Sequence, residues 1–189
     1  MAKKSAQRLS EIPEAELTPR QRALMDAIKS GPRGKVSQAG PFGIFLYAPE
    51  FGDLAQRLGA HCRFGTSVPP RLSEFAILCT ARYWRANYEW HAHAIIAEKA
   101  GVLPATIADI KAGRAPKKAP KDERAIYDFF KEYYKTRRVS ERTYKRVHAI
   151  LGNQGMVELT GTLGYYVIIS ALLNVFNVPV PLGAKPAFG

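Results

Sequence analysis

Two side chains near the middle of the chain have a spacing that suits proton transfer. Glu89 and His93 are four residues apart in a segment that is predicted to be helical, so they share one face, one turn apart. A carboxylate beside an imidazole can fix its tautomer, raise its pKa and hold it ready for proton transfer. The alternative interpretation is a solvated surface pair that contributes roughly 0.2–0.5 kcal/mol to helix stability.

Two helices have to position this pair. The pattern of residues 71–101 predicts two helices joined by a short turn, with apolar residues at helical spacing in the first. Asn87 suits the N-cap of the second helix and Gly101 its C-terminal end. Glu74 lies on the first helix, and it would meet Glu89 and His93 if the two helices pack face to face.

The same segment contains two histidines, but their spacing does not favour a metal site. His91 and His93 are about 200° apart around a helix, so they cannot easily bind one ion. Only Glu89 and His93 have the i,i+4 spacing that two helix-borne ligands need. We therefore expect no metal and no cofactor.

The segment resembles the carboxymuconolactone decarboxylase family, which includes the alkylhydroperoxidase D branch. The resemblance rests on three groups of motifs that together touch most of the chain from about residue 40 onward. They are Arg71-Leu72-Ser73-Glu74 with Tyr88-Glu89-Trp90-x-x-His93 and Ala100-Gly101; Gly164-Tyr165-Tyr166 with Leu172-Leu173-Asn174 and Val178-Pro179-Val180-Pro181; and Gly40-Pro41-Phe42-Gly43.

The resemblance implies an all-α, alkylhydroperoxidase D-like helical domain that forms homo-oligomers. It also shows a departure, because the peroxidase branch has an acid, a CxxC pair and a histidine. At the matching positions this chain has Glu74, then Ala86 and Glu89 in place of the cysteines, then His93. Disulfide chemistry of that kind cannot run without the two thiols. Cys79 does not replace them, since it lies about 140° around the helix from Glu74.

The acid–acid–histidine set that remains suits a cofactor-free enzyme acting on a small carboxylated lactone or a related anionic compound. His93, held by Glu89, would deliver a proton to carbon, and Glu74 would position the pair. Arg71 and Arg82 are the candidates to bind the substrate carboxylate. Phe42 lies in a loop rich in glycine and proline, and it is a candidate pocket wall.

Three other functions remain open. An alkylhydroperoxidase or peroxiredoxin activity follows from the resemblance but is opposed by the missing CxxC. A non-catalytic binding or assembly protein is compatible with the Glu–His pair, which packing alone could retain. A nucleic-acid-binding protein is supported only by charge.

Composition is that of a globular protein. The chain has 189 residues, of which 47% are hydrophobic and 23% charged, enough for one domain with its own core. We expect a flexible lead-in over residues 1–17 and a single domain over 18–189. The N-terminus lacks the apolar stretch of a secretory signal, and the two cysteines, Cys62 and Cys79, suggest neither a disulfide framework nor a zinc site. We therefore expect a cytoplasmic protein.

The net charge of +12 is concentrated between Lys111 and Arg146. A nucleic-acid footprint would explain it, but no helix-turn-helix, zinc-finger or RNA-binding signature accompanies it, and acidic residues are interspersed. We favour a solvated surface that also attracts anionic substrates, and we expect no nucleic-acid partner.

Helical patterns cover the rest of the chain. The expected helices are 18–30, 49–62, 104–112, 121–135, 140–151 and 156–176. The last helix carries no charged residue from 159 to 178 and is long enough to span a bilayer, although its glycines and asparagines oppose insertion. We expect a central helix buried on all sides, covered in part by a partner subunit, and no membrane association.

Overall fold

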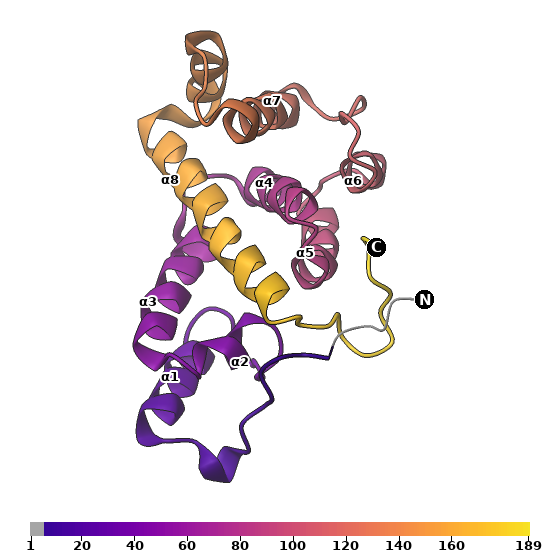
Figure 1. The fold of residues 1–189 in the computed structure, drawn as a ribbon. Helices are drawn as coiled ribbons and strands as arrows, with labels where there is room; N and C mark the ends of the chain where they lie inside the picture. Colours follow the sequence, from indigo (N-terminus) through magenta and orange to yellow (C-terminus); the bar gives the residue numbers. More distant parts are fainter. Residues whose placement is uncertain (1–5) are drawn as a thin grey trace.

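The structure, a computed structural model, describes residues 6–189 and contains no strand among them (Figure 1). The all-α prediction is therefore confirmed for this part of the chain. The α-helices are α1 (Pro19–Ser30), α2 (Pro41–Phe45), α3 (Pro49–Ala60), α4 (Pro70–Tyr83), α5 (Asn87–Lys99), α6 (Pro104–Lys111), α7 (Lys121–Thr136) and α8 (Glu141–Val175). Two short turns complete them, a 3-10 turn η1 (Glu14–Glu16) and a π-helical turn η2 (His61–Gly65).

Helix α4 is the centre of the fold. Its residues from Leu72 to Ala81 are all buried, because α5, α6, α7 and α8 pack around it (Figure 1). Pro70 occupies its first position, where a missing N–H costs nothing. A side chain on α4 therefore faces the interior whichever way it points, and Glu74 is buried for this reason.

Helix α8 joins two hydrophobic clusters. One cluster lies between α4, α7 and the first half of α8, and it includes Phe75, Phe129 and Leu159. The other lies between α1, α2, α3 and the second half of α8, and it includes Phe45 and Ile169. Because the part of α8 after Gly152 contributes to both clusters, it connects the two ends of the molecule (Figure 1).

Several predicted helix ends agree with the structure. Thr18 and Gln21 form the expected capping box at the start of α1. Ser140 accepts a hydrogen bond from the backbone N–H of Thr143 at the start of α8. The predicted helices 140–151 and 156–176 correspond to the two parts of α8, which are separated by a non-helical residue, Gly152, whose φ of 64° and ψ of −173° are available almost only to glycine.

The predicted N-cap of α5 is wrong. Asn87 is the first residue of the helix, and Ala86 occupies the cap position without a side-chain hydrogen bond. The Asn87 side chain instead makes two hydrogen bonds with the backbone of Phe188, at 3.1 Å and 2.8 Å. A long-range contact with the C-terminal segment thus replaces the local cap.

The described part of the N-terminal lead-in is held against the body. The backbone N–H of Arg8 donates to the carbonyl of Phe176, and its side chain donates to the carbonyl of Val175. The side chain of Gln38 pairs with the backbone of Ile12. Of the lead-in expected over residues 1–17, residues 1–5 lie outside the described part.

Among the described residues, α8 alone is long and apolar enough to cross a membrane by length and composition, and half of its most apolar window is buried. It is not buried on all sides as expected. One face points outward along its length, with Val157 73% exposed and Val175 54% exposed. Protein covers the faces that pack on α4 and α7 and, with fewer contacts, on α2, η2, α3 and α5.

Candidate active site

Two helices, α4 and α5, bring an acid–acid–histidine cluster together in the interior. Glu74 comes from α4, and Glu89 and His93 come from α5; each residue is no more than 5% exposed. The Nδ1 of His93 lies 2.6 Å from Oε2 of Glu74, and its Nε2 lies 3.5 Å from Oε1 of Glu89. Tyr166 of α8 places its ring edge-on to the imidazole, with ring centres 5.0 Å apart. The face-to-face packing of α4 and α5 thus places one carboxylate at each nitrogen of His93.

The two carboxylates decide the charge of His93. Burial by itself lowers the pKa of His93, because a charged ring loses hydration. The charge and hydrogen bond of Glu74, together with those of Glu89, outweigh burial and raise the pKa from 6.5 to about 9. At neutral pH His93 is therefore an imidazolium with a proton on each nitrogen, and it can act as a general acid.

A small cavity of about 50 Å³ opens on one side of this cluster. Glu89 and His93 line it, whereas Glu74 does not. The rest of its wall comes from α2 and the loop before it, from η2 and from α8: Arg33, Pro41, Phe42, Arg63, Tyr165, Tyr166 and Ile169. The volume holds one or two water molecules, so a larger substrate has to widen the cavity when it binds.

Two arginines in the cavity wall were not singled out from the sequence. Arg33 donates to the backbone carbonyl of Gln56 at 2.9 Å, and burial lowers the pKa of Arg33. The guanidinium of Arg63 lies 4.8 Å from the ring centre of Phe64, and its buried Nε has no hydrogen-bond partner. In the sequence, only their position in or beside loops indicated that they could line a site. Neither lies on the helix of His93, so helical spacing could not relate them to it.

The arginines named from the sequence lie elsewhere. Arg71 forms ion pairs with Asp122 and Glu123 of α7, and it does not line the cavity. Arg82 donates to the backbone carbonyl of Lys111 at 2.8 Å and is also outside the cavity. Phe42 does lie in the cavity wall, as expected. The physical reason is that Arg71 and Arg82 point from α4 toward α7 and α6, while the cavity opens toward α8.

Neither thiol is placed for redox chemistry at this cavity. Cys62 and Cys79 are both buried and free, and neither lines the cavity. Burial raises the pKa of both thiols, so they stay protonated and are poor nucleophiles at neutral pH. Within residues 6–189, no cluster of three or more His, Cys, Asp or Glu side chains could hold a metal ion.

Several larger hollows lie away from this cluster, and two of them have the following size and lining. One of about 670 Å³ is lined by α7 and the start of α8, and one of about 780 Å³ is lined by the end of α8 and the C-terminal segment. Neither is lined by a histidine, and the chemistry therefore points to the smaller cavity. Comparisons with protein-family models and with curated proteins found no match for this chain.

Proposed function

We propose that this protein is a cofactor-free acid–base enzyme of the carboxymuconolactone decarboxylase type, acting on a small carboxylated lactone or a related anionic compound. The observation that supports the proposal is the buried imidazolium of His93 between Glu74 and Glu89, facing a cavity that two arginines also line. The resemblance of residues 71–101 to that family, a resemblance that includes these three residues, also supports it.

The first step is binding of the substrate anion. Arg63 offers an Nε–H that has no partner in the protein, and Arg33 adds a second positive charge. A carboxylate paired with arginine is stabilised as an anion, so these residues suit the carboxylate that the product retains. The carboxylate that leaves would lie away from them, toward Ile169 of the cavity wall.

The second step is loss of carbon dioxide and protonation of carbon. The breaking C–C bond leaves its electron pair on the conjugated carbonyl system of the substrate, and the Nε2 proton of His93 is transferred to carbon. The 3.5 Å contact between Nε2 and Glu89 is long enough to open as the substrate enters. Glu74 holds Nδ1 throughout, and solvent returns the proton to His93 after product release.

The test is carbon dioxide release from γ-carboxymuconolactone by the wild type and by His93→Ala. We expect release by the wild type and a loss of roughly 100-fold or more in kcat for the variant, since general acid catalysis contributes about that much. Release that does not depend on His93 would contradict the assignment of this site. Consumption of a peroxide with a dithiol reductant, and no release from a panel of related lactones, would favour the redox alternative.

A second variant separates binding from proton transfer. Arg63→Met keeps an unbranched apolar side chain but removes the charged guanidinium that lies over Phe64. We expect KM to rise by roughly 10- to 100-fold, which corresponds to loss of one charged hydrogen bond, with a smaller change in kcat. The matched control is Arg82→Met, which removes an arginine that does not line the cavity, and it should leave KM unchanged.

A further inference from the structure

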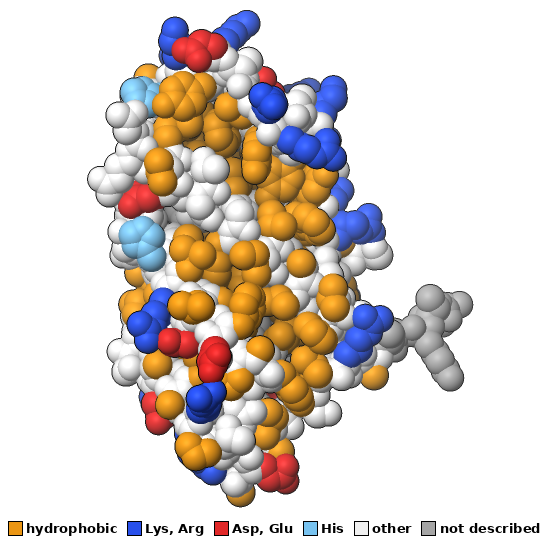
Figure 2. Space-filling model, turned by 60° about the vertical axis from the view of Figure 1, so that its left-hand side comes forward, with side chains coloured by type: hydrophobic (Ala, Val, Ile, Leu, Met, Phe, Trp, Pro, Cys, Tyr) orange, Lys and Arg blue, Asp and Glu red, His pale blue; other side chains and the backbone are white. Residues whose placement is uncertain are grey.

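The part of α8 after Gly152 carries one acidic side chain in an otherwise uncharged stretch. Counting aspartate, glutamate, lysine and arginine, Glu158 is the only such residue between positions 147 and 184 of the sequence. Figure 2 shows that hydrophobic side chains gather on the face over α3 and α8 and that acidic side chains are few there. The side chain of Glu158 is only 11% exposed. A carboxylate in such a place costs free energy unless donors satisfy it, so its partners indicate its role.

The partners of Glu158 lie at the two ends of η2. Its Oε2 accepts hydrogen bonds from the Oγ1 of Thr66 at 3.0 Å and from the backbone N–H and Oγ of Ser67 at 2.7 Å and 2.6 Å. Its Oε1 accepts from Gln154 at 3.1 Å and lies 3.5 Å from Nε2 of His61. Because His61 is the first residue of η2 and Thr66 directly follows the last, one carboxylate holds the turn at both ends.

The geometry of η2 explains why it needs this support. A π-helical turn is rare, and such turns occur frequently at functional sites. Ala60, which precedes η2, gives it no side-chain cap. Ser73 of α4 donates to the carbonyl of Cys62 at 3.5 Å, which is long for a hydrogen bond. The shorter hydrogen bonds to Glu158 are therefore the stronger constraint on where η2 lies.

η2 also carries Arg63, which lies in the cavity wall together with Glu89 and His93. The guanidinium of Arg63 lies 4.8 Å from the ring centre of Phe64, the next residue of the same turn. Its buried Nε has no hydrogen-bond partner. Because the ring contact is internal to η2, the position of the guanidinium depends on the backbone of the turn.

The carboxylate form of Glu158 suits this role. The hydrogen bonds from Ser67 and Gln154, followed by the one from Thr66, lower the pKa of Glu158 to about 2, so it is ionised at neutral pH. An ionised carboxylate only accepts hydrogen bonds, and both of its oxygens here face donors. A glutamine would replace one oxygen by an NH2 group that cannot accept, so one set of donors would lose its partner.

We propose that Glu158 is a positioning residue for the substrate carboxylate, because it holds η2 against α8 and thereby keeps the guanidinium of Arg63 in the cavity wall. Glu158 does not line the cavity itself, so it acts on the substrate only through Arg63. The inference rests on the proposed function, since it takes Arg63 as the residue that binds the substrate anion. It assigns to Glu158 control of the affinity for a carboxylate, and no part in proton transfer by His93.

The first test separates affinity from turnover. We expect Glu158→Gln to raise KM by roughly 10-fold and to change kcat by less than about two-fold. The matched control is Glu141→Gln, which removes an exposed carboxylate from the first part of α8 and should change neither. In the double variant Glu158→Gln/Arg63→Met, KM should equal that of Arg63→Met alone, because no guanidinium is left to position.

A merely structural tie between η2 and α8 would give a different result. Glu158→Gln would then lower stability in urea unfolding, while the effects of Glu158→Gln and Arg63→Met on KM would multiply in the double variant. Multiplied effects, or an unchanged KM in Glu158→Gln, would overturn the proposal.

The second test needs no turnover. Formate is the probe, because it is a single carboxylate small enough for a cavity of about 50 Å³. The NMR signal of the Arg63 Nε–H, assigned by its loss in Arg63→Met, should shift as formate is added to the wild type. Glu158→Gln should need roughly 10-fold more formate for the same shift, and Glu141→Gln should need no more than the wild type.

The two tests distinguish failure of this proposal from failure of the proposed reaction. Formate binding at Arg63 that depends on Glu158, without turnover of any lactone, would contradict the reaction and support the role of Glu158. Turnover with equal formate affinity in the wild type and Glu158→Gln would overturn that role and leave the reaction standing. An Arg63 signal that does not respond to formate in the wild type would also overturn it.

Discussion

At the scale of the residue, Glu74 is the side chain that sets the protonation of His93. Spacing along the chain relates Glu89 to His93, but the shorter contact, 2.6 Å, is the one to Glu74 from another helix. Glu74 also lies behind His93, outside the cavity wall. It is therefore a positioning residue, and its effect should be visible as a change in the titration of the imidazole.

We predict that Glu74→Gln lowers the pKa of His93 from about 9 by roughly 1–3 units. The amide keeps the shape and a hydrogen-bond acceptor but removes the charge, while burial continues to disfavour the imidazolium. The measurement is an NMR titration of the His93 ring nitrogens. Glu98→Gln, which removes an exposed carboxylate from the same helix, is the control and should leave the midpoint unchanged. An unchanged midpoint in Glu74→Gln would show that the ion pair does not hold the proton.

The same shift makes stability depend on pH. The pKa of His93 is about 9 in the folded protein and 6.5 when unperturbed, so the folded state binds the proton more tightly. The stabilisation is fully present below pH 6.5 and is lost as the pH rises through 9, by an amount on the order of 3 kcal/mol. Urea unfolding at several pH values should show this decline in the wild type. A decline of the same size in Glu74→Gln would contradict its attribution to this pair.

At the scale of the element, Arg71 joins α4 to α7. Its guanidinium pairs with Asp122 and Glu123 at the start of α7, and the side chain of Glu123 is fully buried. Burial raises the pKa of Glu123, whereas Arg71 lowers it. Arg71, which the sequence suggested as a substrate ligand, therefore holds two helices together, because it faces α7 rather than the cavity.

We predict that Arg71→Met destabilises the protein by about 3–5 kcal/mol, because it leaves the carboxylate of Glu123 buried without its partner. The double variant Arg71→Met/Glu123→Gln should recover part of that loss, since no charge is then left unpaired in the interior. Urea unfolding of the wild type, both single variants and the double variant measures the coupling. Additive effects of the two substitutions would argue against the ion pair as the link.

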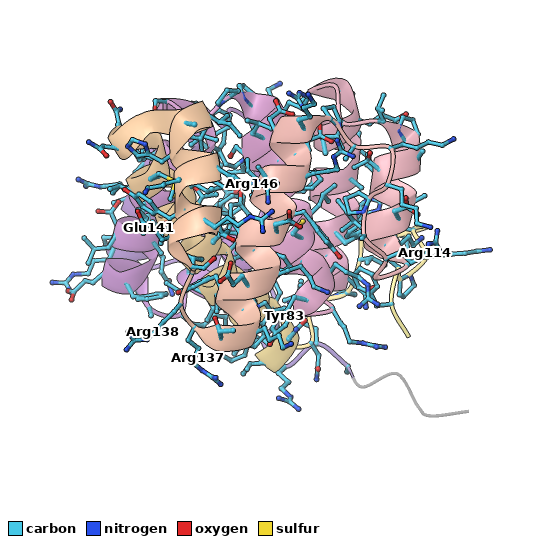
Figure 3. All side chains as sticks on the ribbon, turned by 90° about the horizontal axis from the view of Figure 1, so that it is seen from above. Tyr83, Arg114, Arg137, Arg138, Glu141 and Arg146 are labelled. Atoms are coloured by element: carbon cyan, nitrogen blue, oxygen red, sulfur yellow. The ribbon has the colours of Figure 1, made fainter. Side chains whose placement is uncertain are left out.

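At the scale of the whole molecule, the basic segment and the cavity lie at different places. Figure 1 shows α7 at the end of the molecule opposite α1 and α2, while the cavity is lined by α2 and by the loop before it. Figure 3 shows Arg114, Arg137 and Arg138 extending outward from this basic end. Charges separated by more than about 10 Å are largely screened at 0.1 M salt, so this segment is poorly placed to guide an anion to His93.

We therefore predict that Lys117→Ala/Lys118→Ala, which neutralises two exposed residues of the basic segment, changes kcat/KM by less than about two-fold at 0.1 M salt. Arg63→Met should change it by far more, because its guanidinium lies in the cavity wall. The comparison uses initial rates on the substrate that the wild type converts. If kcat/KM fell by the same factor in both variants, the basic segment would be shown to attract the substrate.

The sequence by itself determined the elements and their local ends. The helix periods, the capping box of Thr18 and Gln21 and the break at Gly152 depend on residues within a few positions of one another, so they could be predicted. The same holds for the i,i+4 relation of Glu89 and His93.

Only the tertiary structure decided which faces of those elements meet. It placed Glu74 against His93. It put Arg33 and Arg63 in the cavity wall, rather than Arg71 and Arg82. The side chain of Asn87, expected to cap a helix, instead contacts Phe188. It also left one face of α8 exposed. These outcomes depend on how segments far apart in the chain pack together. The helical spacing of residues shows which face of a helix is apolar, but not which other segment covers that face.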